Sequence, residues 1–77
     1  MFLSDAPKEV KLKIAEFGSS KEIKRKLTNI GLHVDDLLVR MNYSVSGPVL
    51  VQNLSAGAGM VALSRDLART IIVNYER

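Results

Sequence analysis

Five short apolar segments, each close to turn-forming residues, restrict what this chain can fold into. Each segment has the length of a strand and is shorter than an ordinary helix. The segments span Val10–Ile14, Leu37–Tyr43, Val49–Gln52, Met60–Leu63 and Ile71–Tyr75. A chain of 77 residues has room for one hydrophobic core, so we expect one domain over residues 1–77. The expected fold is mainly β, with five strands closed into a small barrel that removes exposed sheet edges.

One stretch between the first two strands has the periodicity of a helix. Ile23, Leu27 and Ile30 recur at positions i, i+4 and i+7, so they form a single apolar stripe. The pattern predicts a short helix over about residues 20–30, with these three side chains buried. This is the only segment of the sequence long enough for several helical turns, so the fold is expected to combine one main helix with the five strands.

Both ends of this helix carry recognisable signals. Ser19 and Glu22 fit a capping box, in which the serine hydroxyl accepts from a helical N–H and the glutamate reaches back to the cap. At the other end, Gly31 suits a left-handed residue after the last turn, and Leu32 suits the hydrophobic contact of a Schellman motif. The helix is therefore the best-defined element of the sequence.

Three local features refine the strands. Phe17 falls one step out of phase with Val10–Ile14, which predicts a β-bulge at Ala15–Glu16. Ser64 can cap a single helical turn before the last strand. Ser55–Gly59, a run of small residues, is expected to form a flexible hairpin tip.

The basic residues are concentrated in the first third of the chain. Residues 1–26 hold seven Lys and Arg against four Asp and Glu, whereas residues 27–77 hold four of each. On a helical wheel, Lys21, Lys24 and Arg25 fall opposite the apolar stripe. Such a face can meet an acidic protein surface, nucleic acid or anionic lipid. It can also be a solvated face that keeps a small domain soluble, which is the interpretation that we favour.

The sequence contains little that could support catalysis or hold a metal. It has no cysteine and one histidine. His33, Asp35 and Asp36 lie close together, but one imidazole with loop carboxylates is a poor start for a site that needs three or four ligands. The Gly-x-Gly at 57–59 lacks the flanking strand and helix of a nucleotide site. We therefore expect no enzyme activity, no cofactor and no structural affinity for iron or zinc.

Three motifs follow one another along most of the chain. Leu-Thr-Asn-Ile-Gly-Leu occupies Leu27–Leu32, Gly-Pro-Val-Leu-Val occupies Gly47–Val51, and Val-Ala-Leu-Ser-Arg begins a third motif that ends at Val73. In this order and spacing they resemble the ferrous iron transport protein A (FeoA) family. The resemblance implies a five-stranded SH3-like β-barrel with a short α-helix.

The resemblance also implies a function. FeoA-like proteins are cytoplasmic accessories of bacterial ferrous iron uptake, acting by contact with the membrane transporter FeoB and catalysing no reaction. Membrane association would be indirect, through that transporter, and no small-molecule substrate is implied. The alternative is a small basic barrel that binds nucleic acid or regulates transcription, with Lys21, Lys24, Arg25 and Lys26 on phosphates. No aromatic residues are interleaved with these cations to stack on bases.

The second strand can be interpreted in two phases. Strict alternation buries its odd-numbered residues, including Tyr43, and leaves Leu38 and Arg40 outside. The family pattern instead points Leu38 inward, and we favour this phase. It exposes an apolar row that becomes a candidate contact surface. The members of that row are Leu37, Val39 and Met41.

Three departures from the family pattern affect this region. Asp35 stands where the family usually has glycine, although aspartate tolerates left-handed geometry better than most residues. Arg40 stands where the family usually has an apolar residue, and the tip from Asn53 to Gly59 is longer than usual. The candidate partner-binding residues are then the helix cations and the strand row, namely Lys21, Lys24, Arg25, Leu37, Val39 and Met41.

Overall fold

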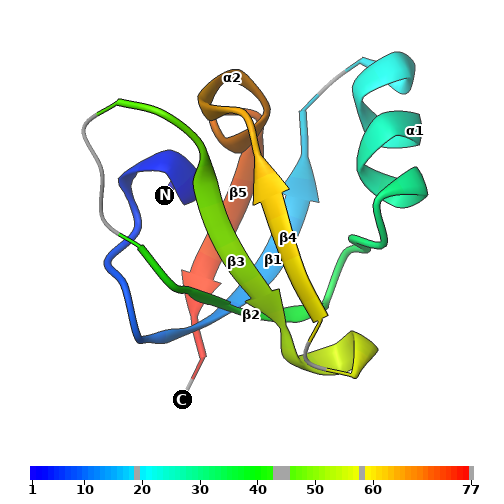
Figure 1. Ribbon diagram of the computed structural model, residues 1–77. Helices are drawn as coiled ribbons and strands as arrows, with labels where there is room; N and C mark the ends of the chain where they lie inside the picture. The colour runs from blue at the N-terminus through cyan, green and yellow to red at the C-terminus, as the bar shows by residue number, and fades with distance from the viewer. Residues whose placement is uncertain (19, 43–45, 58, 77) are drawn as a thin grey trace.

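The computed structural model describes residues 1–18, 20–42, 46–57 and 59–76. Its five strands form one antiparallel sheet in the order β4-β3-β2-β1-β5 (Figure 1). The strands are β1 Lys11–Phe17, β2 Leu37–Arg40, β3 Val49–Asn53, β4 Gly59–Leu63 and β5 Ile71–Tyr75. The helices are α1 Lys21–Asn29 and α2 Arg65–Ala68, and two short 3-10 turns are η1 Leu3–Asp5 and η2 Leu54–Ala56.

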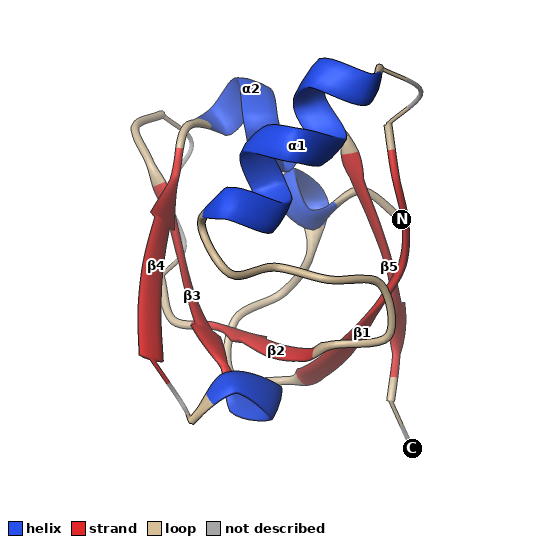
Figure 2. Cartoon of the chain, turned by 90° about the vertical axis from the view of Figure 1, so that its right-hand side faces the viewer, coloured by secondary structure: helices blue, strands red, loops and turns tan. Residues whose placement is uncertain are grey.

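The sheet curls so that its two edge strands face each other across the interior, and α1 lies over the space between them (Figure 2). The predicted five-stranded SH3-like architecture is confirmed, but the ladder of strand pairs does not close. In the described part of the chain, β4 and β5 are the two edges. The β5 edge is covered by the N-terminus, because the Val73 N–H donates to the Met1 carbonyl at 2.8 Å and Phe2 bridges to Ile72.

The core lies inside this curl. Each strand contributes inward-facing aliphatic side chains at alternate positions, and α1, η1, α2 and the loop after α1 close the ends. The fully buried apolar residues are Leu3, Ala6, Leu12, Ile14, Leu27, Leu32, Leu38, Val49, Val51, Leu63, Ala68, Ile71 and Val73.

The predicted bulge in β1 is confirmed. Pairing with β5 runs regularly to Ile14, shifts by one residue and resumes at Glu16. The extra residue returns Phe17 to the side where it packs against the core. Gly18 follows, and the chain leaves the sheet toward α1.

Helix α1 forms where predicted, with two corrections. Its N-cap is Ser20, whose hydroxyl accepts from the Ile23 N–H at 3.4 Å, and not Ser19, which lies outside the described residues. Leu27 is fully buried and Ile23 packs partly on the core, but the prediction that Ile30 is buried was wrong, since it is 40% exposed. Ile30 is the C-cap, with φ −91° and ψ 7°, so its side chain has left the helical stripe.

The predicted Schellman ending is confirmed. The N–H of Leu32 donates to the Leu27 carbonyl and the N–H of Gly31 donates to the Thr28 carbonyl, both at 3.0 Å. Gly31 has φ +92°, a left-handed conformation that is unfavourable for residues with a Cβ atom. Leu32 is buried beside the helix.

We predict that Gly31→Ala lowers the free energy of unfolding by about 1–2 kcal/mol, because alanine resists the left-handed conformation. Gly59→Ala is the matched control. A Cβ at either position meets open space, but only Gly31 has a positive φ. Urea denaturation of both variants checks the prediction, and equal losses would contradict it.

The structure decides the phase of β2. Leu38 is fully buried, whereas Leu37 and Val39 are half-buried and Met41 is 41% exposed. The family phase is thus right and simple alternation was wrong; Tyr43 lies outside the described residues. Leu38 pairs with Leu12 of β1, and directly opposite residues of a sheet share one face.

Two unusual residues frame β2. Asp35 adopts φ +74°, the left-handed geometry expected of it, and its N–H donates to the Ile14 carbonyl at 2.8 Å. Arg40, at the other end, is fully buried. Its Nη1 donates to the carbonyls of Ser4 at 2.9 Å and Ala6 at 3.0 Å, and more weakly to that of Leu3 at 3.4 Å. An inward-facing arginine therefore ties the N-terminal turn to the sheet.

The β3–β4 connection has more internal structure than the sequence suggested. A short 3-10 turn, η2, follows β3, and the Asn53 side chain accepts from the Ser55 N–H at 3.0 Å. The Ser55 hydroxyl in turn accepts from the Leu37 N–H at 3.0 Å, which joins the tip to the start of β2. Ala58 lies outside the described residues.

The end of the chain follows the prediction. Ser64 caps α2 by accepting from the Leu67 N–H at 3.2 Å, and β5 follows. No helix in the described ranges has both the length and the apolar character to cross a bilayer.

Candidate functional site

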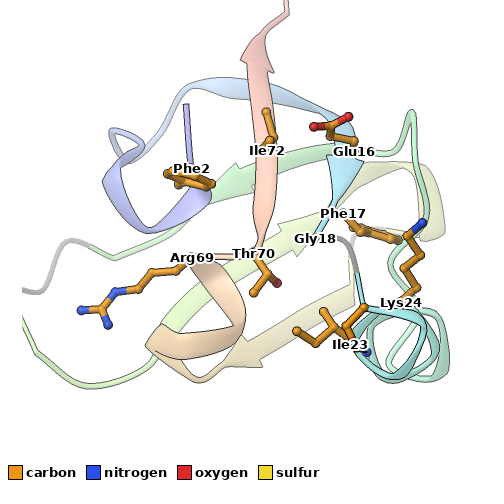
Figure 3. A pocket seen from close by; sticks show the side chains of 10 residues that line it. Phe2, Glu16, Phe17, Gly18, Ile23, Lys24, Arg69, Thr70 and Ile72 are labelled. Atoms are coloured by element: carbon orange, nitrogen blue, oxygen red, sulfur yellow. Dashed lines mark hydrogen bonds between the residues drawn. The ribbon is translucent and has the colours of Figure 1, made fainter.

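The basic residues of α1 have different surroundings. Lys21, Lys24 and Arg25 are all exposed. Lys24 lies at the side of the helix that faces β1 and lines a groove, whereas Lys21 and Arg25 are not part of that lining (Figure 3). One cation of the predicted patch, Lys24, therefore borders the groove, and the other two lie outside its lining.

The outer face of β2 continues across the neighbouring strands. Val39 pairs with Lys11 of β1 on one side and with Gln52 of β3 on the other, and Gln52 pairs with Met60 of β4. We call these four residues the outer row. The row contains two apolar side chains, the half-buried Val39 and Met60, which is 57% exposed, and Lys11 stands at its β1 end. The sequence pointed to Val39, but Met60 joins it only through the strand register.

Further apolar side chains adjoin the outer row. Leu37 is two residues before Val39 in β2, so the two side chains lie on the same face of the sheet. On β3, Leu50 pairs with the exposed Ala62 of β4. The Met41 N–H donates to the Leu50 carbonyl at 2.8 Å, which places the exposed Met41 beside this pair. The outer face of the sheet thus carries apolar side chains on β2, β3 and β4, with Gln52 among them and Lys11 on the β1 side.

The outer row and helix α1 lie on opposite sides of the core. Figure 2 shows α1 over the interior of the curled sheet and β2 on the far side of that interior. Leu27 of α1 and Leu38 of β2 both point into the core between them. One flat partner surface cannot meet both candidate surfaces at once.

A groove opens between α1, the end of β1, the α2–β5 junction and the N-terminus (Figure 3). Its volume is about 590 Å³. Gly18 and Thr70 pack closely at its base, where a Cβ on Gly18 would stand only 3.1 Å from the Thr70 Cβ. The lining residues are Phe2, Glu16, Phe17, Gly18, Ser20, Ile23, Lys24, Arg69, Thr70 and Ile72.

The hydroxyl groups of the groove already serve its own backbone. The Ser20 oxygen accepts from the Ile23 N–H, and the Thr70 hydroxyl donates to the Leu67 carbonyl at 2.6 Å. Neither hydroxyl group is paired with a general base in the described hydrogen bonds.

The loop residues considered as metal ligands hold the loop together. Asp36 Oδ2 accepts from the His33 N–H and from Asn53 Nδ2, both at 2.9 Å, and lies 3.5 Å from His33 Nδ1. Asn53 Nδ2 also donates to the Gly31 carbonyl at 2.9 Å. Across the described ranges, no three His, Cys, Asp or Glu residues come together as a metal site.

Known proteins have a similar sequence or a similar fold. A family model described as the FeoA domain matches residues 1–75. The chain belongs to the FeoA family. Among solved structures, an iron uptake regulatory protein (FeoA) superposes with a TM-score of 0.85 at 19% identity, over 96% of this chain and 95% of that one. Iron(II) transport protein A from Clostridium thermocellum gives 0.84 at 21% identity, over 97% of this chain and 45% of that one.

The same fold occurs within larger regulators. A manganese-dependent transcriptional repressor in complex with manganese superposes with a TM-score of 0.87 at 21% identity, over 97% of this chain but 36% of the repressor. At such identities the superpositions establish the fold alone. No protein with a curated description matches the sequence.

Proposed function

We propose that this FeoA-family chain is a non-enzymatic accessory protein of bacterial ferrous iron uptake. It works in the cytoplasm by contact with a FeoB-type transporter. Membership of the family supports the link to ferrous iron. The observation that carries the contact is the group of exposed apolar side chains on the outer sheet face, where Met41, just after β2, and Met60, on the edge strand β4, are 41% and 57% exposed. In protein interfaces, apolar side chains of this kind form the buried core, and polar residues form the rim around it.

The two sequence-predicted surfaces take different parts in this proposal. Val39 and its neighbours on the outer face provide apolar area that becomes buried on contact. Lys21, Lys24 and Arg25 contribute a positive potential that speeds encounter with an acidic partner without being buried. The first surface therefore controls dissociation, and the second controls association and its salt dependence.

We predict that Val39→Asp weakens binding to purified FeoB by at least about tenfold, since it places a carboxylate in the middle of a desolvated contact. The fold should survive, because Val39 lies outside the hydrophobic core and directly opposite Lys11, whose positive charge favours a carboxylate across the strand pair. Val34→Asp, at a 48% exposed site in the α1–β2 loop outside the outer row, is the matched control and should bind normally. Equal affinity of both variants, measured by biolayer interferometry, would contradict the assignment of the outer face.

Reversing Lys21, Lys24 and Arg25 together to Glu should slow association with FeoB and reduce its salt dependence, with a smaller effect on dissociation. The alternative function is nucleic-acid binding, which is suggested by the fold that this chain shares with the repressor. If the chain binds nucleic acid, the same reversal abolishes binding to a random oligonucleotide and leaves FeoB binding unchanged.

A further inference from the structure

Strand β4 is an open edge of the sheet. It pairs with β3 alone, and among the described backbone hydrogen bonds none reaches it from another segment (Figure 2). The opposite edge, β5, has Met1 and Phe2 paired beside it. Natural proteins usually protect an open edge with charged residues, proline or a bulge. β4 reads Gly-Met-Val-Ala-Leu and pairs with β3 in one unbroken register, so it has none of these protections.

The strand register shows which backbone groups of β4 face the open edge. The Met41 N–H donates to the Leu50 carbonyl at 2.8 Å, so the backbone groups of Leu50 are directed toward β2 and away from β4. In an antiparallel pair of strands, opposite residues alternate between pairs that exchange hydrogen bonds and pairs that do not. Leu50 and Ala62 therefore form a pair without mutual hydrogen bonds, and so do Gln52 and Met60. The N–H and C=O groups of Met60 and Ala62 then point to the open edge.

A cleft lies beside the same strand. Its volume is about 290 Å³, and its lining includes Gly59, Met60 and Val61 of β4 and Ile30 at the end of α1. A Cβ on Gly59 would meet no heavy atom within 4 Å, so the cleft is open at this position. Gly59 pairs with the buried Asn53, so both lie on the core-facing side of the sheet. A side chain opposite Gly59 on an added strand would therefore point into the cleft.

We propose that the β4 edge binds an extended segment of a partner protein as a sixth strand. The backbone of the segment pairs with Met60 and Ala62, and a large apolar side chain of the segment enters the cleft. In strand addition, main-chain hydrogen bonds provide affinity and pockets for alternate side chains provide specificity. The described lining of the cleft has no charged side chain, so it favours an apolar anchor.

A second copy of the chain fits the edge less well. Two β4 strands can pair symmetrically about Val61, but Leu63 of the second copy then lies opposite Gly59. Leu63 is 1% exposed because it belongs to the core of its own chain, so it cannot enter the cleft. Met60 belongs to the outer row as well as to the edge, so a partner on the outer face lies next to the edge. The inference rests on the proposed function in that the partner is a protein, and it names the segment recognised.

Selection from a random peptide library displayed on phage, with the full chain immobilised, tests this. The expected peptides have large apolar residues at alternate positions and no proline between them. Ala62→Pro should lower the affinity of a synthetic selected peptide about tenfold in fluorescence anisotropy, because it removes an N–H from the open edge and none from the β3 pairing. Ala62→Thr keeps that N–H and is the matched control, which should bind normally.

Gly59→Leu tests the cleft separately from the backbone. The leucine side chain occupies the open space at this position while the N–H and C=O groups of the edge stay available. We expect a loss of at least about tenfold in affinity for the same peptide. Circular dichroism confirms the fold of each variant.

Three results would overturn the proposal: no enrichment, enrichment of peptides without an alternating apolar pattern, or equal affinity of Ala62→Pro and Ala62→Thr for the selected peptide. Sedimentation equilibrium that shows a dimer of the free chain, converted to monomers by Ala62→Pro, would overturn it in favour of a second copy. Peptide binding that meets every expectation while FeoB fails to bind would support the edge site and count only against the transporter as the partner.

Discussion

Arg40→Ala should lower the free energy of unfolding by about 3–5 kcal/mol, a large part of the stability of a small domain. Arg40 is fully buried, and its removal leaves a cavity in the core. It also removes the Nη1 donor from the carbonyls of Ser4 and Ala6, which then lose a bond of 2.9 and 3.0 Å respectively. Because these carbonyls belong to the N-terminal turn, the Met1–Phe2 segment should loosen from β5 as well.

Arg40→Met separates the two causes. Methionine fills most of the space but donates no hydrogen bond, so its loss should be about 1–3 kcal/mol, the cost of leaving buried acceptors unsatisfied. Urea denaturation monitored by circular dichroism measures both variants. A loss of less than about 1 kcal/mol for Arg40→Ala would show that the guanidinium is dispensable for stability.

Leu27→Ala should cost about 3 kcal/mol and lower the melting temperature by more than about 10 °C. Leu27 is the α1 residue that reaches the centre of the core, and its carbonyl also accepts from Leu32 in the Schellman motif. Alanine keeps the backbone bond, so the loss reports on packing alone.

Ile30→Ala, at a 40% exposed position beyond the last helical turn, is the control and should cost less than about 1 kcal/mol. Differential scanning calorimetry compares the two variants. Similar losses at Leu27 and Ile30 would contradict the observed end of the helical stripe.

Local signals in the sequence predicted most of the fold. The glycine at 31 requires a left-handed turn and Phe17 requires a bulge, and both features depend on neighbouring residues only. Ile30 was misjudged because the stripe was extended by one position past the helix. The phase of β2 could not follow from alternation, since burying Arg40 requires the Ser4 and Ala6 carbonyls, which come from far away in the sequence.

The candidate sites were less predictable than the fold. Val39 was found from the sequence, but Met60 joins it only through two strand registers. The groove was missed because Phe2, Ile23, Arg69 and Ile72 come from separate segments, and no periodic pattern connects them. Phe2 is half-exposed and lies near the start of the chain, and no pattern in the sequence indicates that it lies beside β5.

Titration of immobilised wild-type chain with purified FeoB in detergent, at low and high salt, tests the central claim most directly. A random oligonucleotide is titrated in parallel. The account predicts saturable binding to FeoB that weakens at high salt but persists, because the apolar outer face carries the contact, and no saturable binding to the oligonucleotide. Absence of FeoB binding at either salt concentration, with saturable binding of the oligonucleotide, would contradict it.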